Sequence, residues 1–330
     1  MGVRVGINGF GRIGRYFTRM AIERPDIEIV AINDLTDSKT LAHLFKYDTV
    51  HRKFSGTVTT NDDDLVLNGQ TIKMFAEKDP KNLPWADLKI DVVLESTGIF
   101  RTEELASQHL TAGAKKVVLS APPRGGNIKS VVLGINEDIL NGSEKIISNA
   151  SCTTNSAAPL VKVMKSLGTI ESCYITTIHS YTSDQRLHDA PHKDLRRARA
   201  AAESIVPTTT GAAKAITKIF PELEGKMGGC GIRVPVPDGS LTDMTFMMDR
   251  ELSLEQVNAA FKQASENDLK GILAYEVDPI VSSDIIGSSY SSSFDSELTS
   301  IIGKMVKVVA WYDNEAGYSN RLVDLVAKVG

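Results

Sequence analysis

Residues 3–21 read VRVGINGFGRIGRYFTRMA, and this stretch decides the fold of the first half of the chain. The apolar residues before Gly9 predict a short buried strand, and the residues after Gly14 predict a helix. Between them, Gly9, Gly11 and Gly14 have G-x-G-x-x-G spacing, which allows a tight turn and close approach of a pyrophosphate. The positive end of the helix would then face the phosphate charge. The stretch therefore predicts a dinucleotide-binding βα unit.

A second predicted strand, residues 27–33, supports this interpretation. The glycine motif alone is also compatible with glycines that merely tighten a turn. However, Asp34 directly follows the second strand, at the distance from Gly14 where an acidic residue accepts hydrogen bonds from the adenosine ribose. Because a carboxylate at this position would repel a 2′-phosphate, we expect the cofactor to be NAD rather than NADP.

Further βα units follow in the same half of the chain. Residues 90–98 and 116–122 are predicted as strands, and residues 102–110 as the helix between them. Small residues lie at the carboxyl ends of both strands, as expected at the ligand-binding edge of an open parallel sheet. Asn68-Gly69 lies between two alternating apolar runs and predicts a hairpin. We therefore expect a mostly, but not purely, parallel sheet.

The composition excludes several classes of protein. The 330 residues suffice for two domains, and 42% hydrophobic with 24% charged residues is typical of a globular protein. A net charge of −4 disfavours a general nucleic-acid or membrane binder, and no apolar run reaches the length of a membrane span. Three cysteines without a pairing pattern, and no secretory leader, favour a reducing cytoplasm.

Cys152 is the candidate nucleophile. It lies in NASCTTN, residues 149–155, where small and hydroxyl residues precede an apolar-periodic run and predict a helix start. Unpaired backbone N–H groups and the helix dipole at such a position favour a thiolate. The local sequence leaves open a buried structural cysteine instead, and that interpretation is preferred for Cys173 and Cys230.

The second half of the chain shows a different pattern. The predicted strands are longer and alternate with polar residues, and they cover residues 174–181, 231–236, 241–249 and 306–312. Helices are predicted over residues 212–220 and after the capping box that begins at Ser253. This mixture indicates an α+β domain with helices on one face of its sheet. Residues 182–203 lack periodicity and are predicted to form a long functional loop, and the stripe within residues 320–329 predicts a helix that returns to the first domain.

Five stretches resemble phosphorylating glyceraldehyde-3-phosphate dehydrogenases, in order and across essentially the whole chain. They are INGFGRIGR at 7–15, SNASCTTN at 148–155, KDLRR at 193–197, TGAAK at 210–214 and WYDNEAGYS at 311–319. The resemblance implies an α/β chain with an N-terminal Rossmann dinucleotide-binding domain and an α+β catalytic domain whose sheet is mostly antiparallel. The implied boundaries are residues 1–151 with the C-terminal helix 315–330 for the first domain, and residues 152–314 for the second.

The resemblance also implies a mechanism and a catalytic pair. Cys152 attacks the aldehyde of D-glyceraldehyde 3-phosphate to form a thiohemiacetal, and hydride transfer to NAD leaves a thioester. Inorganic phosphate then releases 1,3-bisphosphoglycerate, a step of glycolysis and gluconeogenesis. The matching histidine is His179, whose pKa range suits acid–base work. A strand histidine by itself is more often structural, which is how we interpret the other five. Since His188 and His192 lack further ligand spacing, no metal site is predicted.

The resemblance assigns the ligand contacts as follows. Cofactor-binding residues are Gly9, Gly11, Arg12, Ile13, Asp34, Lys78, Ser120 and Asn314. Residues for the attacking phosphate are Ser151, Thr153, Thr210 and Gly211. Residues for the substrate phosphate are Thr182, Arg197 and Arg233, with Arg233 shared between the two sites. A solvated face or a subunit contact is the alternative for the arginine cluster around Arg197.

The implied partners are the aldehyde substrate, inorganic phosphate and further copies of the chain in a cytoplasmic homotetramer. No membrane and no specific nucleic acid are expected. Ala190 precedes Pro191, where many NAD-specific relatives carry leucine, so use of NADP as a second cofactor stays open. Two other functions stay open as well: an erythrose-4-phosphate dehydrogenase, which hydrolyses the thioester, and a non-catalytic NAD-binding protein with an interaction role.

Overall fold

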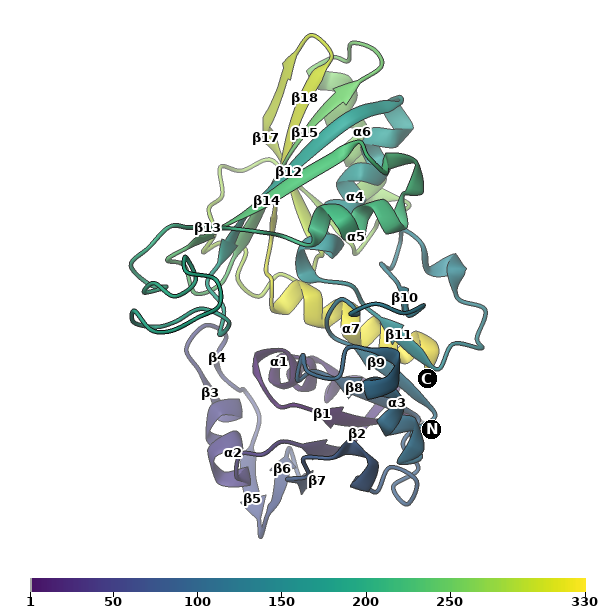
Figure 1. Ribbon diagram of the computed structural model, residues 1–330, viewed down its shortest axis with the longest axis vertical. Helices are drawn as coiled ribbons and strands as arrows, with labels where there is room; N and C mark the ends of the chain where they lie inside the picture. The colour runs from purple at the N-terminus through teal and green to yellow at the C-terminus, as the bar shows by residue number, and fades with distance from the viewer. Residues whose placement is uncertain (1) are drawn as a thin grey trace. The chain divides into compact units, whose positions relative to one another are not determined.

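The computed structural model describes residues 2–330, and the chain divides into two units (Figure 1). Within the described residues, the first unit comprises residues 2–131, Glu137–Ala150 and Ser319–Gly330. The second unit comprises Val132–Asn136 and Ser151–Tyr318. Met1, which belongs to the predicted first domain, lies outside the described residues.

The first unit is built on a nine-stranded sheet with the order β10-β11-β9-β8-β1-β2-β7-β6-β5. The strands are β1 Val3–Asn8, β2 Ile27–Asn33, β5 Val58–Asn61, β6 Asp64–Leu67, β7 Gln70–Phe75, β8 Val92–Glu95, β9 Lys116–Leu119, β10 Lys129–Ser130 and β11 Ile146–Ser148. A separate pair is formed by β3 Tyr47–Asp48 and β4 Arg52–Lys53. The helices are α1 Arg12–Ala21, α2 Ser38–Lys46 and α3 Glu103–Thr111, with 3₁₀ turns η1 Pro80–Asn82 and η2 Glu137–Ile139.

The glycine motif forms the predicted strand–turn–helix between β1 and α1. Gly9 has φ +94°, and a Cβ at this position would lie 2.7 Å from the backbone nitrogen of Thr97. A Cβ on Gly14 would lie 2.3 Å from the carbonyl oxygen of Gly9, so both positions require glycine. The helix begins at Arg12 rather than after Gly14, because Gly11 already serves as its N-cap.

The sheet is mostly parallel, as predicted, with one antiparallel edge. β1 pairs in parallel with both β2 and β8, which places it at the centre of the sheet. The predicted hairpin joins β6 to β7, and its central residues Asn68 and Gly69 have φ 50° and 84°. Two positive φ values in succession are typical of a type I′ turn, which matches the twist of the flanking strands.

The second unit is built on a seven-stranded sheet with the order β13-β14-β12-β15-β18-β17-β16. The strands are β12 Ile170–Ser180, β13 Val206–Thr208, β14 Met227–Val234, β15 Ser240–Met248, β16 Leu273–Glu276, β17 Ser292–Ile302 and β18 Met305–Tyr312. The helices are α4 Cys152–Leu167, α5 Ala212–Ile219 and α6 Leu254–Glu266, with a 3₁₀ turn η3 Pro221–Leu223. Most strand pairs are antiparallel, β12/β14 and β16/β17 being parallel, and the three helices lie together on one side of the sheet (Figure 1).

Strand β17 was not predicted, although it is among the longest in the chain. Its first half contains Ser292 and Ser293, which are fully buried although serine is uncommon in strands. Only Phe294 supplies a large apolar side chain to this part of the core, where its ring stacks on Phe261 of α6 at 3.8 Å. The local sequence therefore lacks the alternation by which strands are recognised.

The C-terminal helix α7, Ala316–Val329, returns to the first unit as predicted. Its residues from Ser319 onward belong to that unit, where Asp324 pairs with Arg24 at 3.1 Å. Leu322, Leu325 and Val326 are fully buried along one side of the helix. Within residues 182–203, the structure shows turns and one bridge between Arg186 and Ala200, which confirms a long loop. In the described part of the chain, no helix is both long and apolar enough to cross a membrane.

Candidate active site

The first unit contains a cavity of about 380 Å³ at the carboxyl ends of its central strands. Its lining residues are Asn8, Gly9, Gly11, Asn33, Asp34, Leu35, Glu77, Lys78, Ser96, Thr97, Ile99 and Phe100. The chain leaves β1 toward α1 at this edge, between the neighbouring strands β2 and β8, as at the ligand crevice of open α/β sheets. The cavity therefore lies where the sequence predicts the dinucleotide.

Two features of this cavity fit a dinucleotide. A Cβ on Gly11 would meet no protein atom within 4 Å, so space is open at the N-terminus of α1. Gly11 is the N-cap residue of α1, and no side-chain hydrogen bond caps this end of the helix. Such a helix N-terminus suits a phosphate ligand. The Asp34 carboxylate, also on the lining of the cavity, is oriented by the backbone N–H groups of Phe10 at 2.8 Å and Thr36 at 3.0 Å.

The predicted cofactor residues are not all at this cavity. Gly9, Gly11, Asp34 and Lys78 line it. Arg12 and Ile13 begin α1, where Arg12 pairs with Asp48 at 2.7 Å. The backbone N–H of Ser120, just after β9, donates to the carbonyl of Glu95 at 2.9 Å. Asn314 belongs to the second unit.

Several lining residues were missed by the sequence analysis. Asn8 and Asn33 end β1 and β2, and the side chain of Asn33 donates to Oδ1 of Asn8 at 2.8 Å. Asn33 also exchanges hydrogen bonds with the backbone of Glu77. The sequence did contain a signal for these two residues, because each is a polar residue at the carboxyl end of a buried strand.

A buried polar network lies behind this wall of the cavity. Glu95 and His109 are almost completely buried, and Nε2 of His109 lies 3.2 Å from Glu95. The indole of Trp85 donates to Nδ1 of His109 at 3.1 Å, so the proton of a neutral ring must be on Nε2, facing the carboxylate. Glu95 also accepts from the side chain of Asn8 at 2.6 Å and the backbone of Thr97 at 2.8 Å.

Replacing Glu95 with glutamine should weaken NAD binding about tenfold and lower the melting temperature. The carboxylate accepts from several buried donors, and an amide NH₂ would face one of them, which typically costs about 1–3 kcal/mol. Titration calorimetry and thermal unfolding measure both effects. Glu104→Gln, at an exposed position of α3, is the matched control, and equal behaviour of the two variants would contradict a supporting role for Glu95.

In the second unit, Cys152 is the first residue of α4. Ser151 is the N-cap, and its hydroxyl accepts from the backbone N–H of Thr154 at 3.1 Å. The chain then returns along β12, where His179 is the penultimate residue. Nε2 of His179 lies 3.5 Å from Sγ of Cys152. The structure thus brings the predicted nucleophile and histidine into direct contact.

Arg233 joins this pair through the register of the parallel strands β12 and β14. His179 and Arg233 are register partners, and Nη1 of Arg233 lies 2.5 Å from Nδ1 of His179. The same Nη1 donates to the carbonyl oxygen of Ser180 at 2.9 Å. Both ring nitrogens of His179 are therefore engaged, one with the sulfur and one with the guanidinium.

Burial governs the protonation of the pair. Although Cys152 is half-buried as a residue, protein atoms surround its sulfur; this burial raises the pKa of the thiol, while the charge of Arg233 lowers it. Burial, and then the charge of Arg233, lower the pKa of His179 to about 3. The thiolate at Cys152 was expected from the helix N-terminus alone, without the effect of burial. In this arrangement, desolvation favours a neutral thiol and a neutral imidazole.

The low pKa of His179 makes stability pH-dependent. Between pH 6.5 and 3, the unfolded chain binds a proton at this residue that the folded chain excludes, so the free energy of unfolding falls as the pH falls. Wild type should lose about 2 kcal/mol more than His179→Asn between pH 7 and pH 5. Melting temperatures at the two pH values test this, and parallel shifts in both proteins would contradict it.

Tyr312 is a site residue that the sequence analysis missed. Its buried hydroxyl lies 2.9 Å from Oγ1 of Thr153 and 2.9 Å from Oγ1 of Thr177, and its ring packs edge-on against His179 at 6.0 Å. Burial raises the pKa of Tyr312, so it stays protonated. The signal was present, since Tyr312 lies in the stretch WYDNEAGYS, from which Asn314 was selected.

Asn314 is held by two serines from neighbouring strands. Its Oδ1 accepts from the hydroxyls of Ser180 at 2.9 Å and Ser240 at 2.6 Å. Because the amide oxygen is used in this way, the amide nitrogen is the group that Asn314 can offer to a ligand.

Only some of the predicted phosphate-binding residues lie next to the Cys152–His179 pair. Thr153 and Arg233 lie against the Cys152–His179 pair, with Ser151 at the adjacent N-cap. The others follow on loops and have local hydrogen bonds: Thr182 with Gln185, Thr210 with the backbone of Ala212, and Gly211 as the N-cap of α5. Arg197 donates to Thr208 at 2.9 Å and pairs with Asp184.

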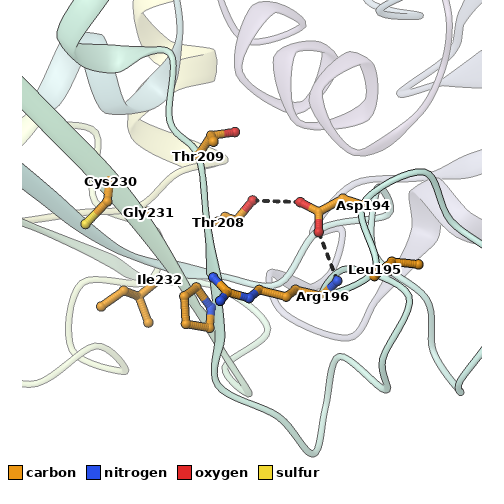
Figure 2. Close-up of a pocket in the computed structure, with 9 residues that line it drawn as sticks. Asp194, Leu195, Arg196, Thr208, Thr209, Cys230, Gly231 and Ile232 are labelled. Atoms are coloured by element: carbon orange, nitrogen blue, oxygen red, sulfur yellow. Dashed lines mark hydrogen bonds between the residues drawn. The ribbon is translucent and has the colours of Figure 1, made fainter.

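A second cavity, of about 520 Å³, lies where the long loop meets β13 and β14 (Figure 2). Asp194 connects the loop to the sheet, since it accepts from the hydroxyl of Thr208 at 3.3 Å and from the backbone of Arg196 at 2.9 Å. Cys230 lies on its wall and is half-buried, so the prediction of a buried cysteine is wrong there. Its sulfur lies 3.7 Å from Oγ1 of Thr176 on the neighbouring strand β12. Cys173 is buried as predicted.

Comparison with known proteins identifies relatives over the full chain. Residues 3–103 match the model of the glyceraldehyde 3-phosphate dehydrogenase NAD binding domain, and residues 151–314 match that of the C-terminal domain. A glyceraldehyde-3-phosphate dehydrogenase of Thermotoga maritima is 60% identical over 324 residues, which cover 97% of each chain. One of Geobacillus stearothermophilus is 55% identical over 331 residues, covering 100% of this chain and 98% of the relative.

Proposed function

This chain belongs to the glyceraldehyde-3-phosphate dehydrogenase family, and from that membership we propose which of its residues perform the reaction. Its activity is the NAD-dependent oxidation of glyceraldehyde 3-phosphate. The single observation that carries the residue assignment is the 3.5 Å contact between Sγ of Cys152 and Nε2 of His179.

Cys152 is the nucleophile in this proposal. Its sulfur attacks the aldehyde carbon while the thiol proton leaves through His179, and a thiohemiacetal results. His179 then takes the hydroxyl proton of the thiohemiacetal as its carbon is oxidised, which leaves a thioester. Bound NAD supplies the hydride acceptor. The backbone N–H of Cys152 and Nε2–H of His179 are the proposed donors to the developing oxyanion.

Inorganic phosphate is the proposed acceptor of the acyl group. Thr153 and Arg233 support this role because a hydroxyl 4.0 Å from the sulfur and a guanidinium against His179 are suitable phosphate donors. Ser151, Thr210 and Gly211 complete the proposed site for the attacking phosphate. Thr182 and Arg197, with Arg233, form the proposed site for the phosphate of the substrate.

Each group of proposed contacts would bind a different part of the cofactor. Gly9 and Gly11, with Arg12 and Ile13 at the start of α1, would hold the pyrophosphate, and Asp34 the adenosine ribose. Lys78 and Ser120 are proposed as further cofactor contacts. Asn314 would donate from its amide nitrogen to the nicotinamide carboxamide, because its oxygen is already used.

We further propose a cytoplasmic homotetramer whose functional domains are residues 1–151 with 315–330, and residues 152–314. The exposed leucines of the long loop, Leu187 and Leu195, support contacts between copies. Sedimentation velocity tests the assembly, and a monomer at micromolar concentration would contradict it.

A steady-state assay of glyceraldehyde 3-phosphate oxidation, in which NAD, NADP and phosphate are varied separately, tests the proposed function. We expect sustained turnover to require phosphate, because phosphate must release the acyl group. Turnover that does not depend on phosphate, with a preference for erythrose 4-phosphate, would instead support hydrolysis of the thioester.

Asp34→Ala should weaken NAD binding about tenfold and raise the affinity for NADP. The change removes a charge-assisted hydrogen-bond acceptor for the ribose and the repulsion of a 2′-phosphate. Dissociation constants for both dinucleotides measure this effect. Asp63→Ala, in the exposed turn between β5 and β6, serves as the control. An unchanged ratio of the two constants in Asp34→Ala would contradict the assignment.

A further inference from the structure

Gln185 is a buried side chain of the long loop, and its amide nitrogen has no acceptor. The residue is only 7% exposed, and among residues 2–330 no group accepts a hydrogen bond from its Nε2. Its amide oxygen accepts from the backbone N–H of Thr182 at 3.3 Å. Since a backbone N–H can only donate, the oxygen must face Thr182, and the nitrogen is the group without a partner. A buried donor of this kind is uncommon in folded proteins and calls for an explanation.

The amide belongs to a tight turn of four residues. The backbone N–H of Gln185 donates to the carbonyl oxygen of Thr182 at 2.9 Å, so backbone and side chain both close the turn. Thr182 is one of the proposed residues for the phosphate of the substrate. The oxygen and nitrogen of an amide share one carbon atom, so the amide nitrogen of Gln185 also lies beside this turn. The donor without a partner is therefore next to a proposed phosphate contact.

The other proposed contacts of this phosphate surround the same turn. Asp184, in the middle of the turn, forms an ion pair with Arg197. Burial lowers the pKa of Arg233 most, while the charge of Arg197 lowers it further and that of Asp184 raises it. Arg197 and Asp184 must therefore lie near Arg233. Two guanidinium groups and Thr182 thus come together at this turn, where the carboxylate is already paired.

We propose that Gln185 is a further substrate-binding residue, whose amide oxygen holds the Thr182 turn and whose amide nitrogen donates to the phosphate group of the substrate. The inference deepens the proposed function and rests on the assignment of Thr182, Arg197 and Arg233 to that phosphate. A phosphate oxygen is the acceptor that the buried amide lacks in the free protein, and hydrogen bonds to such an anion are among the strong ones.

This contact makes Gln185 a residue for substrate specificity. An aldehyde without a phosphate group, such as D-glyceraldehyde, leaves the amide nitrogen buried and without an acceptor. Sites built to hydrogen-bond a polar group of the substrate reject analogues that lack this group for the same reason. Gln185 therefore contributes to the selection of the phosphorylated aldehyde over the unphosphorylated one.

Two substitutions separate the two ends of the side chain. In Gln185→Glu, one carboxylate oxygen still accepts from Thr182, but a second negatively charged oxygen replaces the amide donor. Gln185→Met keeps a side chain of similar length and loses both hydrogen-bonding groups. Gln263→Glu, at an exposed position of α6, is the matched control for the added charge.

Steady-state oxidation of glyceraldehyde 3-phosphate and of D-glyceraldehyde, at saturating NAD and fixed phosphate, tests the inference. In Gln185→Glu, we expect KM for glyceraldehyde 3-phosphate to rise at least about tenfold, as for the loss of a hydrogen bond to a charged group. The value of kcat, the oxidation of D-glyceraldehyde and the dissociation constant of NAD should stay near those of wild type. Gln185→Met should raise the same KM by a smaller factor, because methionine adds no repulsion. Gln263→Glu should behave as wild type.

The other outcomes contradict the inference in distinguishable ways. A raised KM in Gln185→Met with a wild-type KM in Gln185→Glu would show that Gln185 only holds the turn. An equal loss with both aldehydes would show a disturbed site rather than a lost phosphate contact. An unchanged KM with a changed sedimentation coefficient in Gln185→Glu would assign the amide nitrogen to a contact between copies of the chain. Failure of the proposed function is a separate result, since wild type itself would then not oxidise glyceraldehyde 3-phosphate.

Discussion

Replacing Cys152 with alanine should reduce aldehyde oxidation by about 10⁵-fold or more. Removal of a catalytic nucleophile eliminates the covalent route altogether, and losses of this size accompany such changes in other enzymes. The expected loss is in kcat, measured with saturating NAD and glyceraldehyde 3-phosphate. NAD binding should persist, because the dinucleotide cavity belongs to the first unit and Cys152 to the second.

Cys230→Ala is the matched control for this prediction. Cys230 is also half-buried, but it lies in the second cavity, away from His179. This variant should keep most of the activity. An active Cys152→Ala protein, or an equal loss in Cys230→Ala, would contradict the assignment of the nucleophile.

His179→Asn should lower kcat by about 10²–10⁴-fold, the usual contribution of a positioned acid–base group. Asparagine can still donate toward the oxyanion, but it cannot accept a proton from the thiol or the thiohemiacetal. The remaining activity should therefore rise with pH, as hydroxide replaces the lost base. A pH profile of kcat from pH 6 to 10 measures this change.

The control for the histidine prediction is His43→Asn, at an exposed position on α2. It should behave as wild type. If His179→Asn kept both the rate and the pH profile of wild type, His179 would have no role in proton transfer.

The parts of the site that could be predicted are those set by local sequence. The turn from β1 to α1 follows from the positive φ of Gly9 and from the lack of space for a Cβ at Gly14. The helix start at Cys152 follows from the hydroxyl of Ser151. The position of His179 in a predicted strand was not enough to identify it as a catalytic residue. It was selected because the chain resembles a family in which a histidine serves the cysteine.

The parts that could not be predicted depend on pairing between distant strands. Ser240 is placed opposite Tyr312 by the register of β15 and β18, and the local sequence of Ser240 gives no sign of a role. The same applies to Arg233, whose contact with Nδ1 of His179 follows from the pairing of β12 with β14. The state of the thiol was also beyond local sequence, because the burial that raises its pKa comes from the tertiary structure.

The central claim is that the acyl group of the substrate is held on one sulfur of this chain. Mass spectrometry of the protein after incubation with glyceraldehyde 3-phosphate and NAD, with phosphate omitted, tests this claim most directly. The account predicts a 3-phosphoglyceroyl thioester on the peptide that contains Cys152, and its disappearance when phosphate is added. Oxidation of the aldehyde with no acyl group on Cys152, or with the acyl group on another residue, would contradict it.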